Sequence, residues 1–450
     1  MIAGIGGCLV LCLVLLAGLP FGQAPAAGEP AAAVDPAGSI RVALLPSGHT
    51  YEVGATGGFE ILDHAGVVID QSTTGATVSV RADNGRLRVG QTGVHTGPLA
   101  VRPRGEASRV IGATRPYRGF IEIRVSDDGT LMVINEVGLE DYLLGVIARE
   151  MPSSWPIEAL KAQAVAARTY GVRQMLAAAR NNAPYAVLAT TASQVYGGYE
   201  AETANTTAAV NETRGMVLYH AGSPISAVYH SSSGGHTENS EVVWVEERPY
   251  LRGVPDFDQM SPRYTWEKAM SHAEITLRVT ARHDIGHILA LNPAGTRGVS
   301  GRYSHLQFVG TEGEATVRSE DARVILGLRS TLFEANVVED VDTNITSTMV
   351  KGQGAVVAGV RDGSLVTTTR PVGRHYSVGP EGVLYRMDSY AVVHRARLPG
   401  GVEFAGQGWG HGVGMSQWGA YQLARDGKTW TEILAHYYQG ASLQQYPAAW

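Results

Sequence analysis

The chain has 450 residues, of which 44% are hydrophobic and 17% charged, and its formal net charge is -6 at pH 7. This composition excludes a disordered chain, which would contain fewer apolar and more charged residues. The 55 glycines follow no three-residue repeat, which excludes collagen, and no long basic run indicates nucleic acid as a partner. The length suggests two or three domains at about 150 residues each.

The first 24 residues carry a candidate export signal. An apolar run from Ile2 to Leu19 contains both cysteines, Cys8 and Cys12, and small residues follow it. A run of this length is typical of a signal peptide over residues 1–24, and an uncleaved N-terminal anchor is the alternative. The remaining chain has no cysteine and no apolar run of about 18 residues. We therefore expect an exported protein, extracellular, in the cell wall or membrane-anchored, that needs no disulfides and contacts the membrane only through this segment.

A linker and a β-rich domain follow. Residues 25–38 are rich in Ala, Pro and Gly, which predicts a flexible linker. Over residues 39–135, short segments of alternating apolar and polar residues are separated by glycine-containing turns, which predicts a small β-rich N-terminal domain. Its predicted strands are Ile40–Leu45, Ala76–Val80, Leu87–Val89, Gly119–Val125 and Leu131–Ile134.

Helices are predicted after residue 136. Apolar residues at helical spacing predict a helix over Leu139–Glu150, and a second helix is expected from Pro156 to about Ala179. The expected fold class is α+β, β-rich, with a helical pair that carries a candidate catalytic glutamate and with a small β-rich domain before it. Further predicted elements are a helix over Ser319–Gly327, β-like segments over 336–402, a glycine-rich loop from Gly406 and a helix over Trp430–Tyr438.

Glu150 is the first candidate for catalysis. It follows Tyr142 and Val146 at a spacing of four residues, so it lies on the apolar face of its helix, at the C-terminal end. Burial, the negative end of the helix dipole and the absence of a cation on that face each raise the pKa of a carboxylate there. A carboxylic acid that keeps its proton near neutral pH is what a general acid requires. The alternative is a glutamate that points into solvent where the helix ends.

Basic residues on the second helix are candidates for binding an anion. Lys161 and Arg168 are seven residues apart and therefore share a face, where they could hold an anionic substrate or the carboxylate of Glu150. The alternative is a solvated face of the helix. Tyr170 is open to the same two interpretations.

A polar segment from Tyr229 to Glu238 offers several chemistries. Its His230, His236 and Glu238 could bind zinc, although their spacing differs from that of a helical zinc protease. Its serines precede glycines, but no nucleophile elbow motif is present. The alternative is a loop that lines a substrate site with hydrogen-bonding groups, among them Ser233.

The glycine-rich segment 406–420 is the densest motif in the chain. It lacks the Lys-Ser/Thr ending of a phosphate-binding loop, which excludes that function. Trp409 and Trp418 could stack on sugar rings, and His411 and Gln417 could hydrogen-bond sugar hydroxyls. A tightly packed turn whose aromatic residues fill the core is the structural alternative.

Three segments together resemble the stage II sporulation protein D family, which includes the LytB-type amidase enhancers. Residues 138–152, which begin Gly-Leu-Glu-Asp-Tyr and end Arg-Glu-Met-Pro, are similar to the family's signature, and 155–170 continue it. The segments 229–237 and 406–420 also resemble the family. The resemblance covers about residues 130 to 335 and 403 to 440.

The resemblance implies cleavage of cell-wall glycan. Characterised members are lytic transglycosylases that act on peptidoglycan strands, preferably stripped of their peptides, and Glu150 matches their catalytic glutamate. A non-catalytic enhancer that binds peptidoglycan and activates an amidase is the alternative, and a metal-dependent hydrolase using His230, His236 and Glu238 is a third. Asp256 and Glu238 are guesses for a second carboxylate. The residues expected to bind substrate are Lys161, Arg168, Tyr170, His230, Ser233, His236, Asp256, Trp409, His411 and Gln417.

The chain departs from the family in two ways. Some members hold zinc with His and Cys in the region that matches His230 to His236, but no cysteine is available here, so we expect no cofactor. The catalytic domain, residues 136–450, also has an apparent insertion at about 336–402 that could extend or cover the cleft.

Overall fold

The computed structural model describes most of the chain. Outside it lie the predicted signal peptide or anchor, residues 1–24, and all but the last residue of the predicted linker, residues 25–38. Between residues 339 and 399 only the backbone is described. The residues not described are 1–37, 45–48, 348, 351–353, 362–363, 371–375, 379–382, 386–391 and 447–450.

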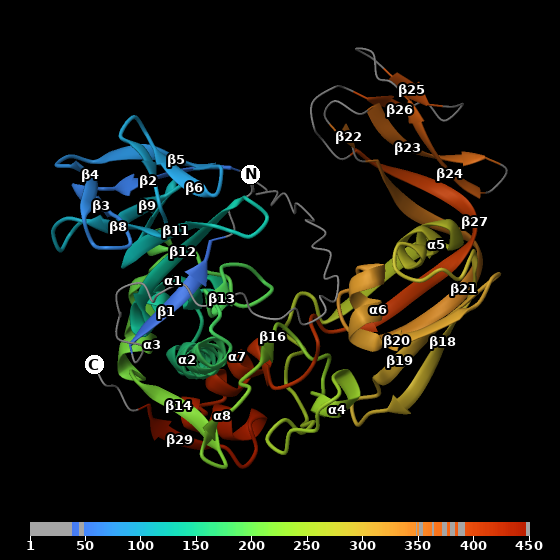
Figure 1. Ribbon diagram of the computed structural model, residues 1–450. Helices are drawn as coiled ribbons and strands as arrows, with labels where there is room; N and C mark the ends of the chain where they lie inside the picture. The colour runs from blue at the N-terminus through green and yellow to red at the C-terminus, as the bar shows by residue number, and fades with distance from the viewer. Residues whose placement is uncertain are drawn as a thin grey trace, which may run out of the picture.

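Two sheets form the N-terminal part of the chain, and their strands are antiparallel except for the parallel pair β1 and β13 (Figure 1). Their inward side chains, such as Val53, Ile121 and Val133, are buried in one hydrophobic core because apolar and polar residues alternate along each strand. One sheet has the order β13-β1-β12-β11-β8-β3-β4 and the other β10-β9-β2-β5-β6-β7. The strands are β1 (Ser39–Ala43), β2 (Thr50–Ala55), β3 (Phe59–Leu62), β4 (Val68–Ser72), β5 (Ala76–Asp83), β6 (Arg86–Val89), β7 (Gly93–His95), β8 (Leu99–Pro103), β9 (Val110–Gly112), β10 (Arg115–Tyr117), β11 (Phe120–Val125), β12 (Leu131–Gly138) and β13 (Val187–Leu188).

The predicted helical pair is present. α1 (Leu139–Glu150) continues directly from β12, and α2 (Ile157–Arg180) begins after Pro156, which is its N-cap. The apolar faces of both helices join the same hydrophobic core as the two sheets. β12 crosses the predicted domain border between residues 135 and 136. The α+β class, rich in strands, is confirmed.

A buried ion pair ties the two helices together. The guanidinium of Arg168 on α2 donates from Nε and Nη2 to both carboxylate oxygens of Glu140 on α1, each at 2.8 Å. The amide of Gly215 also donates to Glu140, at 3.1 Å, and Arg168 is fully buried. Two parallel charge-assisted hydrogen bonds fix the angle between the helices as well as their separation.

The C-terminal segment returns to the helical pair (Figure 1). Val413, Met415, Ile433 and Leu434 lie in the same core as α1 and α2, although more than 200 residues separate them in sequence. The connecting pairings are parallel between β16 and β28 and antiparallel between β14 and β29. These elements are α3 (Ala204–Glu212), β14 (Met216–His220), β15 (Ser223–Pro224), β16 (Tyr229–His230), α4 (Ser240–Val243), β28 (Met415–Ser416), α7 (Gln417–Arg425), α8 (Trp430–Tyr437) and β29 (Ser442–Gln445), with a 3-10 turn at Tyr199–Ala201.

A second hydrophobic core is formed by residues that lie, in the sequence, between the helical pair and the C-terminal segment. It begins at Trp266 and ends at Phe404, so it starts well before the predicted insertion at 336–402. The predicted helix over Ser319–Gly327 is confirmed as α6. Its last residue is Leu326, and Gly327 caps it with a left-handed backbone conformation. The elements are β17 (Thr265–Ser271), α5 (His272–Thr280), β18 (Ile288–Arg297), β19 (Tyr303–Gly310), β20 (Glu314–Arg318), α6 (Ser319–Leu326), β21 (Leu332–Ser347), β22 (Met349–Val350), β23 (Gly354–Arg361), β24 (Ser364–Arg370), β25 (Tyr376–Val378), β26 (Val383–Tyr385) and β27 (Val392–Gln407).

Among the helices that the structure describes, none combines the length and the apolar character needed to cross a membrane.

We predict that Arg168→Met destabilises the protein by about 3–5 kcal/mol, because it leaves the buried carboxylate of Glu140 without its cation. Chemical denaturation monitored by circular dichroism measures the change in free energy of unfolding. The matched control is Lys161→Met on the same helix, whose partners are Glu158 and the more exposed Glu212, and we expect it to cost about 1 kcal/mol or less. Equal effects of the two substitutions would contradict the structural role of the buried pair.

Candidate active site

Glu150 is the last residue of α1, and its carboxyl group is partly buried. Its Oε1 accepts a hydrogen bond from the backbone amide of Val195 at 2.9 Å. The Gln417 side chain and the Tyr229 hydroxyl also hydrogen-bond the carboxylate. Burial raises the pKa of Glu150, and this effect is larger than the lowering by the three neutral donors. The geometry thus holds an acid that keeps its proton at higher pH than an exposed glutamate does.

A parallel strand pairing brings these partners to Glu150. Tyr229 in β16 pairs with Met415 in β28, and His230 pairs with Ser416. Ser416 then caps α7 by accepting a hydrogen bond from the amide of Gly419. As a result Gln417, the first residue of α7, lies next to Tyr229 and beside the end of α1.

A chain of side-chain hydrogen bonds leads to the carboxylate. The hydroxyl of Tyr142 donates to Gln194 at 3.1 Å, and the amide of Gln194 donates to the hydroxyl of Tyr229 at 2.9 Å. Because that hydroxyl accepts from Gln194, its own proton is directed to Glu150. Burial and the proximity of Glu150 raise the pKa of Tyr229, which therefore stays a donor. Tyr170 is close to this chain, and its hydroxyl bonds Ser193 and Gln174 rather than Glu150.

Three aromatic rings gather near the site. Trp155, which follows α1, lies 4.7 Å from Trp418 and 4.9 Å from Tyr421, measured between ring centroids. Trp418 and Tyr421 are 5.4 Å apart. All three side chains are partly exposed, and Trp418 directly follows Gln417. The rings are tilted by 51° to 68° to one another, so each presents its own partly exposed apolar face, of the kind that packs on sugar rings.

Trp409 lies in a different environment. The guanidinium carbon of Arg263 is 4.2 Å from the centroid of its ring, and that of Arg329 is 5.2 Å away. The backbone of Trp409 forms two hydrogen bonds with Ser232, which is three residues beyond Tyr229.

The histidines of the two motifs face each other beneath the site. The rings of His230 and His411 are 5.2 Å apart. Burial lowers the pKa of both, that of His411 to about 4, so both are neutral at physiological pH. His230 Nδ1 bonds the carbonyl of Val413, and His411 Nδ1 accepts from the amide of Val413. These bonds fix the glycine-rich loop behind Tyr229.

Ser233 and Asp256 form a buried pair. The hydroxyl of Ser233 donates to Asp256 at 2.6 Å, and Tyr437 donates to the other carboxylate oxygen at 2.6 Å. Burial raises the pKa of Asp256, but the carboxylate is only 3% exposed. In this arrangement the polar atoms of both residues are occupied by one another and by Tyr437, and the expectation that they bind substrate stays a prediction.

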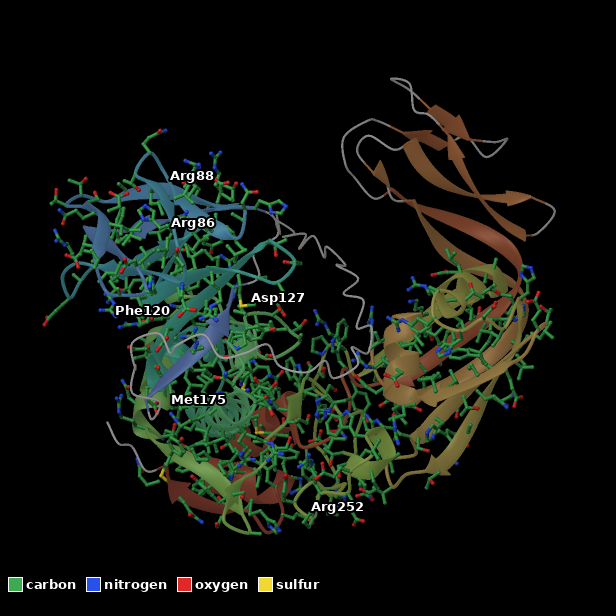
Figure 2. All side chains as sticks on the ribbon, viewed as in Figure 1. Arg86, Arg88, Phe120, Asp127, Met175 and Arg252 are labelled. Carbon is green, nitrogen blue, oxygen red and sulfur yellow. The ribbon has the colours of Figure 1, made fainter. Side chains whose placement is uncertain are left out.

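A cavity of about 490 Å³ lies away from Glu150. It separates the face of the first sheet, at Phe120, from the second half of α2, at Met175 (Figure 2). Arg41 crosses its floor and bonds Glu122 at 2.8 Å and Glu136 at 2.6 Å. Two of the carboxylates that line this cavity are therefore paired with arginine, and the third, Asp63, accepts hydrogen bonds from the amides of Ala65 and Val67. The pKa raised by burial points to Glu150 instead.

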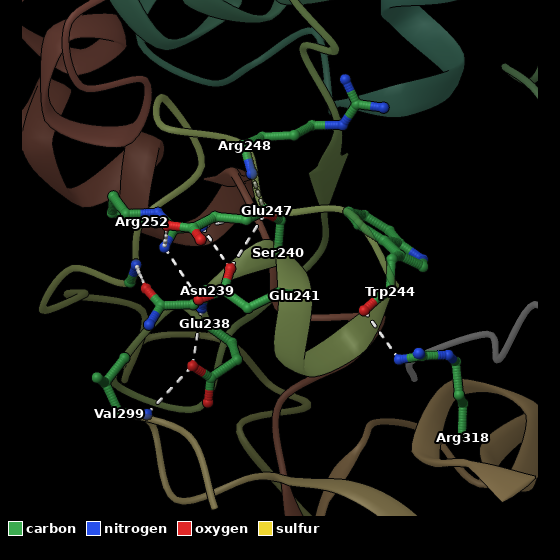
Figure 3. A network of polar contacts seen from close by, with 11 residues as sticks. Glu238, Asn239, Ser240, Glu241, Trp244, Glu247, Arg248, Arg252, Val299 and Arg318 are labelled. Carbon is green, nitrogen blue, oxygen red and sulfur yellow. Dashed lines mark hydrogen bonds and ion pairs between the residues drawn. The ribbon is translucent and has the colours of Figure 1, made fainter. Parts of the chain in front are cut away.

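The third hypothesis, a metal-dependent hydrolase, does not fit the structure. The carboxylate of Glu238 accepts hydrogen bonds from the amides of Asn239 and Val299 (Figure 3). It also accepts one from the amide of Ser300. His236 Nδ1 bonds the carbonyl of the next residue at 2.6 Å. The described residues contain no group of three or more His, Cys, Asp or Glu side chains that could hold a metal ion. The zinc site of some family members is therefore not assembled from the His and Glu residues described here.

The two basic residues of α2 do not reach Glu150. Lys161 bonds Glu158 and Glu212, at 2.8 Å and 2.7 Å, and Arg168 bonds Glu140. They do share a face, as predicted, but that face packs toward α3. The expectation that they hold Glu150 is wrong, because their charges are neutralised by other carboxylates.

Sequence reasoning missed several residues of the site. Tyr229 lies in a segment that the sequence singled out, but its role depends on a pairing with residues almost 190 positions away. Gln194 and Val195 begin a short segment, residues 194–198, that resembles the family only weakly. Trp155 lies in the segment 155–170 that continues the family signature, but no local pattern predicts its contact with Trp418 and Tyr421.

The sequence of this chain is similar to those of known proteins. The family described as "SpoIID: Stage II sporulation protein" matches residues 127–220. The stage II sporulation protein D of Bacillus subtilis is 30% identical over 330 residues, which are 69% of this chain and 76% of that protein. The amidase enhancer of Bacillus subtilis is 30% identical over 388 residues, which are 83% of this chain and 50% of that protein. An uncharacterised protein of Brachyspira hyodysenteriae is 28% identical over 415 residues, which are 90% of this chain and 93% of that protein.

The fold and the site define a β-rich α+β protein with one partly buried acid held by neutral donors. With the similarity to stage II sporulation protein D over most of both chains, the chain belongs to the stage II sporulation protein D family.

We predict that Tyr229→Phe raises the pKa of Glu150 further, because it removes a donor that stabilises the carboxylate while the ring keeps water out. NMR titration of protein labelled with 13C at glutamate Cδ measures this, and Glu150→Gln assigns the signal. The control is Tyr170→Phe, which removes a hydroxyl that does not contact Glu150. An unchanged or lower pKa in Tyr229→Phe would contradict the hydrogen bond.

Proposed function

We propose that this chain is a peptidoglycan lytic transglycosylase and that Glu150 is its general acid and general base. The observation that carries the proposal is a single carboxyl group whose pKa is raised by burial and which only neutral donors contact. Membership of the stage II sporulation protein D family supports a role in sporulation or in amidase enhancement. The aromatic residues around Glu150 support a carbohydrate substrate.

The reaction needs one proton donor that also accepts a proton. Glu150 donates its proton to the oxygen that links N-acetylmuramic acid to N-acetylglucosamine, and the bond from that oxygen to muramic C1 breaks. The resulting carboxylate takes the proton from the C6 hydroxyl of the same muramic unit while O6 bonds to C1. The products are a 1,6-anhydromuramic end and a free N-acetylglucosamine end, and Glu150 regains its proton without the use of water.

The surroundings of Glu150 fit this cycle better than hydrolysis. A glycoside hydrolase uses two carboxyl groups, about 5 to 10 Å apart, of which one activates water or attacks the sugar. Among the described groups that shift the pKa of Glu150, none is a carboxylate. Tyr229, Gln417 and the amide of Val195 stabilise the anion that forms after the first proton transfer. Burial raises the pKa of Glu150 and so favours the return of a proton from the C6 hydroxyl.

A second candidate function is enhancement of a cell-wall amidase without catalysis. The relative named amidase enhancer favours it. Both functions require binding to peptidoglycan strands. They differ in whether the glycosidic bond is cleaved.

We predict that the described chain from residue 38 converts purified glycan strands to fragments with 1,6-anhydromuramic ends, as measured by mass spectrometry. Glu150→Gln keeps the shape and loses the proton, so we expect the rate to fall by at least about 100-fold. The matched control is Asp141→Asn, which removes a half-exposed carboxylate from the opposite face of α1 and should leave the rate unchanged.

Other products would point to other mechanisms. Reducing muramic ends would indicate hydrolysis and overturn the transglycosylase mechanism. Intact strands that still bind the protein would favour the amidase enhancer. Strands both with and without peptides are tested, because the preference for stripped strands is an expectation from the family.

We predict that metal chelators leave cleavage unchanged, because Nδ1 of His236 bonds the carbonyl of Thr237 and the carboxylate of Glu238 accepts hydrogen bonds from the amides of Val299 and Ser300. The rate is measured before and after treatment with a chelator. Loss of cleavage that zinc restores would contradict this prediction.

A further inference from the structure

Trp409 and the two arginines beside it form a surface group that the proposed catalytic cycle does not use. Arg263 and Arg329 are both exposed, and Trp409 is partly exposed between them. They come from three segments of the chain, which lie near residues 263, 329 and 409.

Backbone hydrogen bonds hold the three residues in place. The amide of Gly408 donates to the carbonyl of Tyr264 at 2.7 Å, next to Arg263, and the amide of Gly410 donates to the carbonyl of Arg329 at 2.9 Å. Gly408 and Gly410 both have positive φ, and a Cβ at Gly408 would lie 2.6 Å from the carbonyl oxygen of Ser232. The two glycines that flank Trp409 therefore allow the close approach that sets it between the arginines.

No carboxylate among the described side chains neutralises the positive charge of this group. Within the part of the chain whose side chains are described, neither Arg263 nor Arg329 forms an ion pair with a carboxylate. A third cation, Lys268, donates to the carbonyls of Leu326 and Gly327. Burial and the nearby Arg278 and Arg329 lower the pKa of Lys268 to about 8, as expected in a region of positive potential. Two guanidinium groups with free donors beside an indole ring form an arrangement that attracts anions.

Trp409, Arg263 and Arg329 lie within reach of the same glycan strand that Glu150 would cleave. Ser232 is three residues from Tyr229, which is about 10 Å along the backbone, and Ser232 itself pairs with Trp409 on a neighbouring segment about 5 Å away. Tyr229 bonds Glu150. A polymer that passes Glu150 can therefore also contact Trp409.

We propose that Trp409, Arg263 and Arg329 form a subsite for an anionic sugar unit, whose ring stacks on the indole and whose acidic group is bound by both guanidinium groups. This inference rests on the proposed function, because it takes the ligand to be a glycan strand. The acidic group is either a carboxylate of the strand itself or a phosphate of a polymer attached to it, since both match two arginine forks.

The test measures binding rather than cleavage. In a Glu150→Gln background, isothermal titration calorimetry gives the Kd for soluble peptidoglycan glycan strands whose peptides have been removed. We expect Arg263→Gln/Arg329→Gln to raise Kd at least about tenfold, since each lost charge-assisted hydrogen bond alone corresponds to about that factor. Trp409→Ala should also weaken binding, and Arg263→Lys/Arg329→Lys should weaken it less than Arg263→Gln/Arg329→Gln, because lysine keeps the charge but not the guanidinium fork.

The matched control is Arg81→Gln/Arg86→Gln, which removes the same two charges from exposed positions of the second N-terminal sheet. It should bind as the Glu150→Gln parent does. An unchanged Kd for Arg263→Gln/Arg329→Gln would overturn the proposal, and so would an equal loss in the control.

Modified strands identify the acidic group. Amidation of the carboxylates with a carbodiimide should abolish the difference between parent and double variant if the ligand group is a carboxylate. Removal of phosphodiesters with hydrofluoric acid should do so if it is a phosphate. If both treatments leave the difference intact, the ligand is not an anionic sugar. Because binding is measured without turnover, failure of the subsite and failure of Glu150 to cleave are separate results.

Discussion

The parallel pairing of Tyr229–His230 with Met415–Ser416 is the contact on which the site depends. It joins two segments that are almost 190 residues apart and brings both to the C-terminal end of α1. Tyr229 and Gln417 reach Glu150 only because their strands are neighbours, and Trp418 meets Trp155 for the same reason. The buried histidines of the two segments stay neutral and hydrogen-bond the loop, so the pairing adds no charge behind the acid.

Four carboxyl groups of this protein, those of Glu140, Glu150, Glu238 and Asp256, differ in their hydrogen-bond partners. Glu140 accepts hydrogen bonds from the guanidinium of Arg168, and Glu238 accepts them from several backbone amides and a serine hydroxyl, so both connect separate parts of the structure. Glu150 has three neutral donors and no cation, which leaves the effect of burial dominant on its pKa. Asp256 also has a raised pKa, but Ser233 and Tyr437 occupy it in the interior. Glu150 alone among these four combines a raised pKa with a partly exposed side chain.

The second hydrophobic core contributes to the same surface. Ser330 accepts from the indole of Trp266 at 3.1 Å and donates to the carbonyl of Gln407 at 2.6 Å, which anchors the start of the glycine-rich segment to this core. Arg329, next to Ser330, thereby lies beside Trp409. The chain between the segments 229–238 and 406–420 thus forms a folded unit that helps to shape the site. Its extension over β21 and β27 carries the segment that the sequence indicated as an insertion.

The amino-acid sequence by itself determined the features that depend on residues a few positions apart. The bounds of α1, the start of α2, the helices at Ser319 and Trp430, and the place of Glu150 on an apolar helix face all follow from spacing within one or two turns. Only the tertiary structure decided which partners the polar groups have: Arg168 bonds Glu140 rather than Glu150, Asp256 is sealed by Ser233, and Glu150 receives Tyr229, Gln417 and the amide of Val195. The physical reason is that helical periodicity is a local property, whereas a hydrogen-bond partner is chosen by which distant strands lie side by side, and no local pattern records that pairing.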